Sequence, residues 1–165
     1  MDTKTKYDQP KDLNDHIIEW VGWIAAILPF VLIFYYFKDL PNQIPIHFNA
    51  VGEPDDYGSK NMIYGIAAVG LAVYGVLFYL NKHPQLLNTP IKIHEENANI
   101  QFYLLQKMTR HIATICALGI SYITYKTIMI GLGKAQELNS TVLILFLIAL
   151  VLPILVYFIM ARKHA

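Results

Sequence analysis

The polar residues best suited to chemistry are concentrated between Lys38 and Lys60. This segment contains one histidine, His47, followed by three carboxylates, Glu53, Asp55 and Asp56. An imidazole and carboxylates that converge could hold a divalent cation. Their spacing matches no fixed metal-ligand motif, so the same residues could instead stabilise turns.

The same segment also carries residues that stop helices and form turns. Pro41, Pro45 and Pro54 exclude a continuous helix. We therefore expect an irregular loop with a short extended stretch around His47. Gly52 can adopt a positive φ, which favours a turn at this point. We predict no catalytic or metal-binding residue here, and we predict these ligand-binding residues: His47, Asn49, Gly52, Pro54, Asp55 and Lys60.

The rest of the chain shows no sign of catalysis. It lacks GxSxG, HExxH, CxxC and a phosphate-binding glycine loop, and Cys116 is the single cysteine. We therefore predict a protein that is not an enzyme and needs no cofactor. The 13 lysines and arginines nearly balance 12 aspartates and glutamates. A nucleic-acid partner is not expected, because it would require a basic patch.

The elements that must position the loop are hydrophobic helices. Hydrophobic residues make up 55% of the 165 residues, and 15% are charged. A helix needs about 20 mostly apolar residues to cross a bilayer, and in lipid only helices and closed barrels satisfy their backbone polar groups. Barrel strands alternate in polarity, which these runs do not. We predict a single transmembrane domain over residues 1–165, with spans at about 20–37, 62–80, 112–132 and 142–161.

The distribution of lysine and arginine predicts the orientation, because cytoplasmic loops carry the excess. We expect both termini to be cytoplasmic in a multi-pass cell-membrane protein, with the loop 38–60 outside. Four positive residues are predicted to lie outside: Lys38, Lys60, Lys126 and Lys134. The larger set predicted to be cytoplasmic is Lys4, Lys6, Lys11, Lys82, Lys92, Lys107, Arg110, Arg162 and Lys163.

The segment between the second and third spans becomes helical from about Ile93. Ile100, Tyr103, Leu104 and Met108 form an apolar stripe. We expect an amphipathic helix that lies along the cytoplasmic interface or continues into the third span. Lys107, Arg110 and His111 would then meet anionic headgroups. The predicted fold class is thus an all-α membrane bundle of four helices, with an irregular outer loop and an interfacial amphipathic helix.

Small residues form stripes on three of the spans, where helix backbones can approach each other closely. We expect these stripes to pack inside the bundle, and a homo-oligomer formed through one of them stays open as an alternative. The stripes are Gly22 and Ala26; Gly65, Ala68, Ala72 and Gly75; and Ala113, Ala117 and Ser121.

Lys126 is the one charged residue inside a predicted span. Charged residues within membranes are functional candidates, although a lysine about 9 Å from the end of a helix can reach the interface with its ammonium group. The alternative function that this residue suggests is a transporter or channel subunit, with Lys126 and hydroxyl residues of the third span facing a pathway.

The stretch LPNQIPIHFNAVGEPDDYGSK, from Leu40 to Lys60, resembles a bacterial membrane family known as domain of unknown function 1648. The resemblance depends on the pair LP, then the pair IP, one hydrophobic residue and the pair HF. A glycine, a proline, an aspartate and a closing lysine follow. A second resemblance covers the segment before the third span, and it includes His83, Pro84, Asn88, Pro90, the run 95–98, Gln101 and Phe102.

This resemblance implies a multi-span protein of undetermined activity. The family includes the N-terminal part of SdpI-type immunity proteins, which protect a cell from a secreted peptide toxin. We therefore expect a non-enzymatic binding, immunity or signalling module that acts through the outer loop. Its expected partners are the lipid bilayer and a peptide toxin or envelope protein.

Overall fold

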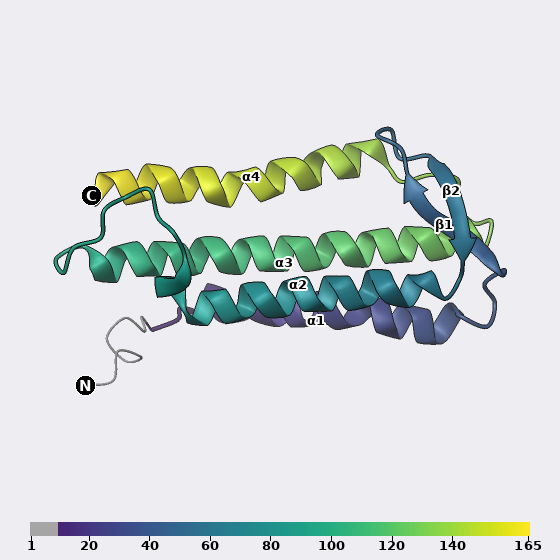
Figure 1. Cartoon of the computed structure of the whole chain (residues 1–165), viewed down its shortest axis with the longest axis horizontal. Coiled ribbons are helices and arrows are strands. Elements are labelled where there is room, and N and C mark those ends of the chain that lie inside the picture. The colour runs from purple at the N-terminus through teal and green to yellow at the C-terminus, as the bar shows by residue number, and fades with distance from the viewer. Residues whose placement is uncertain (1–9) are drawn as a thin grey trace.

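The computed structural model describes residues 10–165, and this part of the chain is mostly helical (Figure 1). Four of its helices are long and apolar enough to cross a membrane. Each overlaps one predicted span, so the predicted bundle of four membrane-spanning helices is confirmed. The helices are α1 (Leu13–Tyr36), α2 (Met62–Lys82), α3 (Ala98–Gly131) and α4 (Ser140–Lys163).

The helices run side by side and define two ends of the bundle (Figure 1). α1 begins and α4 ends at one of them, the terminal end, where the short 3-10 helix η1 (Pro84–Leu86) also lies. The opposite end is the hairpin end. It carries strands β1 (Gln43–Phe48) and β2 (Pro54–Ser59) together with the loop 132–139. The four helices alternate in direction. Because their number is even, the start of α1 and the end of α4 lie at the same end of the bundle.

Capping explains where α1 and α4 begin. The carboxylate of Asp12 accepts a hydrogen bond from the Asp15 backbone N–H, and the Asp15 side chain accepts one from the Asp12 N–H. This reciprocal capping box satisfies donors that have no partner within the first turn. The side chain of Asn139 accepts a hydrogen bond from the Val142 N–H at the start of α4.

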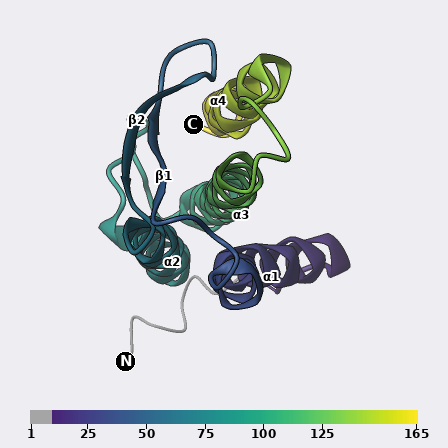
Figure 2. The ribbon, with the colours of Figure 1, turned by 90° about the vertical axis from the view of Figure 1, so that its right-hand side faces the viewer.

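α3 is the central helix of the bundle, as the view from the hairpin end shows (Figure 2). It packs against α1, α2 and α4. Its small residues Ala113, Ala117 and Ser121 are buried, and so are Gly22 and Ala26 on α1. Packing through these two stripes is therefore confirmed. α4 instead exposes most of its apolar surface, as expected of a helix surrounded by lipid.

The small-residue stripe predicted for α2 is wrong as a packing surface within the chain. A Cβ added at Gly65 or Gly75 would meet no atom within 4 Å. α2 uses another face, which places Ile63, Ala67, Gly70, Tyr74 and Asn81 in the core. Tyr74 decides this choice, because its ring fills the space beside Gly22 and its hydroxyl donates to the Glu19 carbonyl at 3.1 Å.

A separate interfacial helix before the third span is not observed. The two are one continuous helix, the 34-residue α3, because no proline or glycine interrupts the sequence between Asn97 and Gly119. Asn97 marks the start, since its side chain bonds the backbone of His94 and Lys92 and closes the preceding turn. At about 1.5 Å per residue, α3 is about 51 Å long and extends well beyond a hydrocarbon core of about 30 Å.

The loop 38–60 is also more regular than predicted. It contains a two-stranded antiparallel hairpin, in which Gln43 pairs with Ser59 and Phe48 with Pro54. The prolines that exclude a helix are compatible with this small sheet, because both strands are edge strands. Pro45 lies within β1, Pro54 begins β2, and the register shifts on both sides of His47.

Candidate functional site

The hairpin carries the predicted ligand-binding residues, and its first strand is fixed by apolar packing. Ile44 and Pro45 of β1 are fully buried, and Leu40 just before the strand is nearly so. They pack against the end of α3, where a Cβ on Gly131 would lie 3.1 Å from Ile44. β1 thus belongs to the core at the hairpin end, and β2 lies farther from the helices, with four of its six residues being Asp, Gly or Ser.

Lys60 fixes the base of the hairpin. Its ammonium donates hydrogen bonds to the carbonyls of Leu40 at 2.9 Å and Phe37 at 3.2 Å, and it lies 4.8 Å from the centre of the Phe37 ring. A cation is favourable at a helix C-terminus, where carbonyls lack partners. The structure therefore gives Lys60 a role in holding the end of α1, at a distance from the tip of the hairpin.

Asn49 and Gly52 build the tip. The Asn49 side-chain oxygen accepts from the N–H groups of Val51 at 3.1 Å and Glu53 at 3.0 Å, and its amide donates to the Glu53 carboxylate. Gly52 has a φ of 94°, a conformation that favours glycine. Its carbonyl accepts from the Leu138 N–H at 2.8 Å, which ties the tip to the loop before α4.

His47 and Asp55 form the exposed polar pair of the hairpin. The Nδ1 atom of His47 lies 2.6 Å from a carboxylate oxygen of Asp55, and the two side chains are 69% and 43% exposed. They come from opposite strands in the region where the register shifts. The ring and the carboxylate are therefore held together while both remain accessible to a ligand.

The predicted residues only partly converge. Pro54 starts β2, Glu53 bonds Asn49, and the Asp56 carboxylate accepts from the Tyr57 N–H at 2.8 Å. Within residues 10–165 there is no group of three histidine, cysteine or acidic side chains placed to hold a metal ion. What the hairpin presents instead is an acidic surface with one imidazole, suited to binding a positively charged group.

Sequence reasoning missed a second polar site, which lies at the terminal end. Arg110 of α3 and Asp15 of α1 form an ion pair at 2.5 Å, and their side chains are only 7% and 2% exposed. Lys107 pairs with Asp12 at 3.1 Å. The expectation that Lys107 and Arg110 both face lipid headgroups is thus replaced by pairing with α1. The spacing of Asp12, Asp15 and Glu19 along one helix face was the available signal.

The ion pairs are supported by hydrogen bonds from side chains to backbone between the helices. Thr114 and Ser121 of α3 donate to carbonyls of α1, and Asn81 of α2 donates to the Gln106 carbonyl of α3. The pKa of Asp12 is held below its ordinary value by the Asp15 backbone N–H and then by Lys107. Together these contacts join α1, α2 and α3 from the terminal end to the middle of the bundle.

The fold and the site define a class: a membrane-spanning four-helix protein with an exposed acidic hairpin between its first two spans. The family model described as Domain of unknown function (DUF1648) matches residues 24–71, which run from α1 through the hairpin into α2. The resemblance of the stretch from Leu40 to Lys60 to this family is therefore confirmed. An uncharacterized protein of Archaeoglobus fulgidus is 27% identical over 150 residues, covering 82% of this chain and 81% of that protein. No solved structure matches.

Proposed function

We propose that this protein is a non-enzymatic binding module of the cell membrane, whose hairpin faces the outside and recognises a peptide or another envelope component. Immunity or signalling would follow from that recognition. The observation that carries the proposal is the His47–Asp55 pair, exposed at the surface of a hairpin that is otherwise anchored. The anchors are the buried Ile44, the Lys60 contacts with α1 and the bond between Gly52 and Leu138.

Rigidity supports this role because a preorganised site loses little entropy when it binds. A protein that needed the hairpin only as a connection between α1 and α2 would not require the tip to contact the loop before α4. The loop contact joins two segments that are far apart in the sequence, and it holds the tip in a single position.

The charge of the hairpin favours a basic ligand. Glu53, Asp55 and Asp56 lie at or beside the start of β2, and Lys60 is already bonded to carbonyls. In the described sheet β2 pairs only with β1, so its other edge is open. An extended peptide can add to such an edge through its backbone, with specificity from its side chains. A lysine or arginine of that peptide would meet the Asp55 carboxylate.

The test is a titration of the purified full chain in detergent micelles with a fluorescent decapeptide of alternating lysine and valine. We expect saturable binding that becomes roughly tenfold weaker when His47→Ala and Asp55→Asn are combined, the cost of one or two charge-assisted bonds. Asp39→Asn is the matched control, because it removes the same charge from an exposed residue outside the hairpin. Equal weakening in the control, or no binding at all, would contradict the proposal.

A second candidate function, as a transport or channel subunit, is favoured by one observation. Thr124 and Thr127 of α3 are completely buried, and their hydroxyls have no hydrogen-bond partner. Buried polar groups without partners are uncommon and call for an explanation such as a transient ligand or ion. Flux into proteoliposomes that is lost in Thr124→Val and in Lys126→Met would support this candidate; absence of flux in the unchanged protein would contradict it.

A further inference from the structure

A groove between α3 and α4 at the terminal end has no part in the function proposed above. It has a volume of about 240 Å³. We propose that it binds the acyl chain of an anionic phospholipid, whose phosphate is bound by Arg162 and Lys163 at the end of α4. The residues that line the groove are Leu104, Lys107, Met108 and His111 of α3, and Leu152, Pro153, Val156 and Tyr157 of α4.

α4 reaches farther towards the terminal end than α1 does (Figure 1). The side chain of Gln101 donates a hydrogen bond to the Ala161 carbonyl, so the last turns of α4 lie beside the first turn of α3. Ile18 of α1 instead lies beside Thr114 of α3, whose hydroxyl donates to the Ile18 carbonyl. From residue 101 to residue 114, α3 rises about 20 Å. The end of α4 therefore lies about 20 Å beyond the level of Ile18.

This additional length of α4 is apolar, whereas the neighbouring helices carry charges at the same level. Residues 151–160 include no charged side chain, and Leu152, Val156 and Ile159 are 57%, 50% and 68% exposed. The groove places Leu152 and Val156 beside Lys107 of α3. An exposed apolar surface next to charged residues is unfavourable in water, so it requires an apolar cover. An acyl chain in the groove supplies that cover.

The end of α4 also supplies cations that have no other partner. Arg162 and Lys163 are exposed and form no ion pair with any residue from 10 to 165. Lys163 lies four residues after Ile159 and seven after Val156, which places these three residues on the same face of α4. A phosphate bound at Lys163 thus continues into an acyl chain that runs along Ile159 and Val156. The cations and the apolar residues follow the covalent order of phosphate, glycerol and acyl chain.

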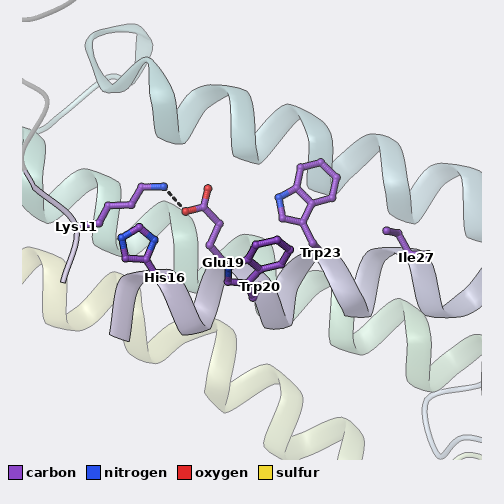
Figure 3. A pocket seen from close by; sticks show the side chains of 6 residues that line it. All are labelled: Lys11, His16, Glu19, Trp20, Trp23 and Ile27. Atoms are coloured by element: carbon purple, nitrogen blue, oxygen red, sulfur yellow. Dashed lines mark hydrogen bonds and ion pairs between the residues drawn. The ribbon is translucent and has the colours of Figure 1, made fainter. Parts of the chain in front are cut away.

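The residues that line the groove include no carboxylate. Lys107 at its side already pairs with Asp12 at 3.1 Å, so the phosphate is assigned to the unpaired cations alone. A larger groove beside α1 is different, because Figure 3 shows Glu19 between Lys11 and Trp20, with its carboxylate bonded to Lys11. An anionic headgroup would be repelled there by Glu19. Of these two grooves, the one between α3 and α4 is therefore suited to an anionic lipid.

The two adjacent cations favour an anionic lipid over two other occupants. Each lysine or arginine near an anionic headgroup adds to the attraction, whereas a choline headgroup carries its own positive charge and offsets it. A second copy of this chain fits less well. Symmetric pairing through this face of α4 would bring Arg162 and Lys163 of both copies close together, and their charges would repel.

The experiment measures lipid binding to the full chain in detergent by native mass spectrometry, with phosphatidylglycerol and phosphatidylcholine of identical acyl chains. We expect phosphatidylglycerol to bind more tightly, and we expect this preference to fall roughly tenfold when Arg162→Gln and Lys163→Gln are combined. The matched control combines Lys38→Gln and Lys134→Gln, which removes two exposed cations at the hairpin end and should keep the preference. Equal binding of the two lipids, or an equal loss in both double variants, would overturn the proposal.

Val156→Trp tests the groove itself. Because Val156 is half exposed, this variant should unfold at the same temperature as the unchanged protein in lipid-free detergent while binding phosphatidylglycerol several-fold more weakly. Unchanged lipid binding in Val156→Trp would overturn the proposal. Dimers that are lost in Val156→Trp would also overturn it, because they would show that the groove is an interface between copies. None of these variants except the control alters the hairpin end, so the results are independent of the peptide titration described above.

Discussion

The two ends of the bundle use charged residues in opposite ways. At the hairpin end, His47 and Asp55 pair with each other and remain exposed, and their pairing does not join one helix to another. At the terminal end, Asp15 and Arg110 are buried and join α1 to α3. Exposed pairs contribute little to stability, whereas breaking a buried pair leaves an uncompensated charge. The hairpin charges are therefore available for binding, while those of the terminal end hold the helices together.

The largest effect that the comparison predicts is at the buried pair. Arg110→Met should lower the free energy of unfolding by about 3–5 kcal/mol, because the buried Asp15 carboxylate would lose its countercharge and keep only the hydrogen bond from the Asp12 N–H. Thermal or denaturant unfolding in detergent measures it. Adding Asp15→Leu to Arg110→Met should recover part of the loss, since no buried charge then remains unpaired, although the hydrogen bond from the Asp12 N–H to the Asp15 side chain is also removed. A double variant as unstable as the single one would show that the pair acts otherwise.

A smaller loss is expected at the tip of the hairpin. Gly52→Ala places a Cβ on a residue with φ of 94° and only 2.5 Å from the Leu138 carbonyl oxygen, so the loop must move. We expect a cost of about 2 kcal/mol, of which strain at positive φ supplies about 1. Gly133→Ala is the matched control, because its φ is also positive at 70° but nothing lies within 4 Å. Equal costs at both glycines would remove the contact with Leu138 as a cause.

A substitution of Lys60 shows whether this residue stabilises the base of the hairpin or takes part in binding. Lys60→Met should cost about 1 kcal/mol in unfolding free energy, because the Leu40 and Phe37 carbonyls lose a charged donor but can be partly hydrated. Lys38→Met, at an exposed residue near the same end, should cost nothing measurable. If Lys60→Met instead left stability unchanged and reduced peptide binding, Lys60 would belong to the binding surface.

The smallest effect concerns pH at the terminal end. The folded-state pKa of Asp12 lies below 3.8, so its capping and its pair with Lys107 stabilise the fold above pH 3.8 and are lost as pH falls through the lower folded value. The unfolding temperature should therefore drop on acidification, and slightly less steeply in Asp12→Asn. Asp39→Asn provides the control, and an identical acid dependence in all three proteins would contradict the prediction.

Much of the architecture was predictable because burial in lipid demands long apolar runs, and α1, α2 and α4 overlap the predicted spans closely. The hairpin was only partly predictable: the prolines excluded a helix, but the pairing of Ile44 with Gly58 depends on the core beneath β1. The continuity of α3 was left open, since amphipathicity alone does not tell whether a helix lies on a membrane or extends from it. The predicted packing through the small-residue stripe of α2 was wrong, because α2 packs through the face that carries the large residue Tyr74.

Among the candidate site residues, composition and turn chemistry located His47, Asn49, Gly52 and Asp55 in one exposed segment. The contacts of these residues could not be predicted from the sequence around them. The partner of Gly52 lies 86 residues away at Leu138, and the Asp15–Arg110 pair is separated by 95 residues. Such contacts depend on how four helices are arranged around α3, and no pattern within one segment encodes that arrangement.

Hydropathy and backbone conformation are local properties, so the amino-acid sequence was enough to predict four membrane-spanning helices and a concentration of turn-forming polar residues between the first two. Which charges are exposed and which are buried became known from the packing of the helices. That distinction depends on the neighbours that packing supplies: an aspartate of the hairpin faces solvent beside a histidine, and an aspartate of α1 faces an arginine in the interior.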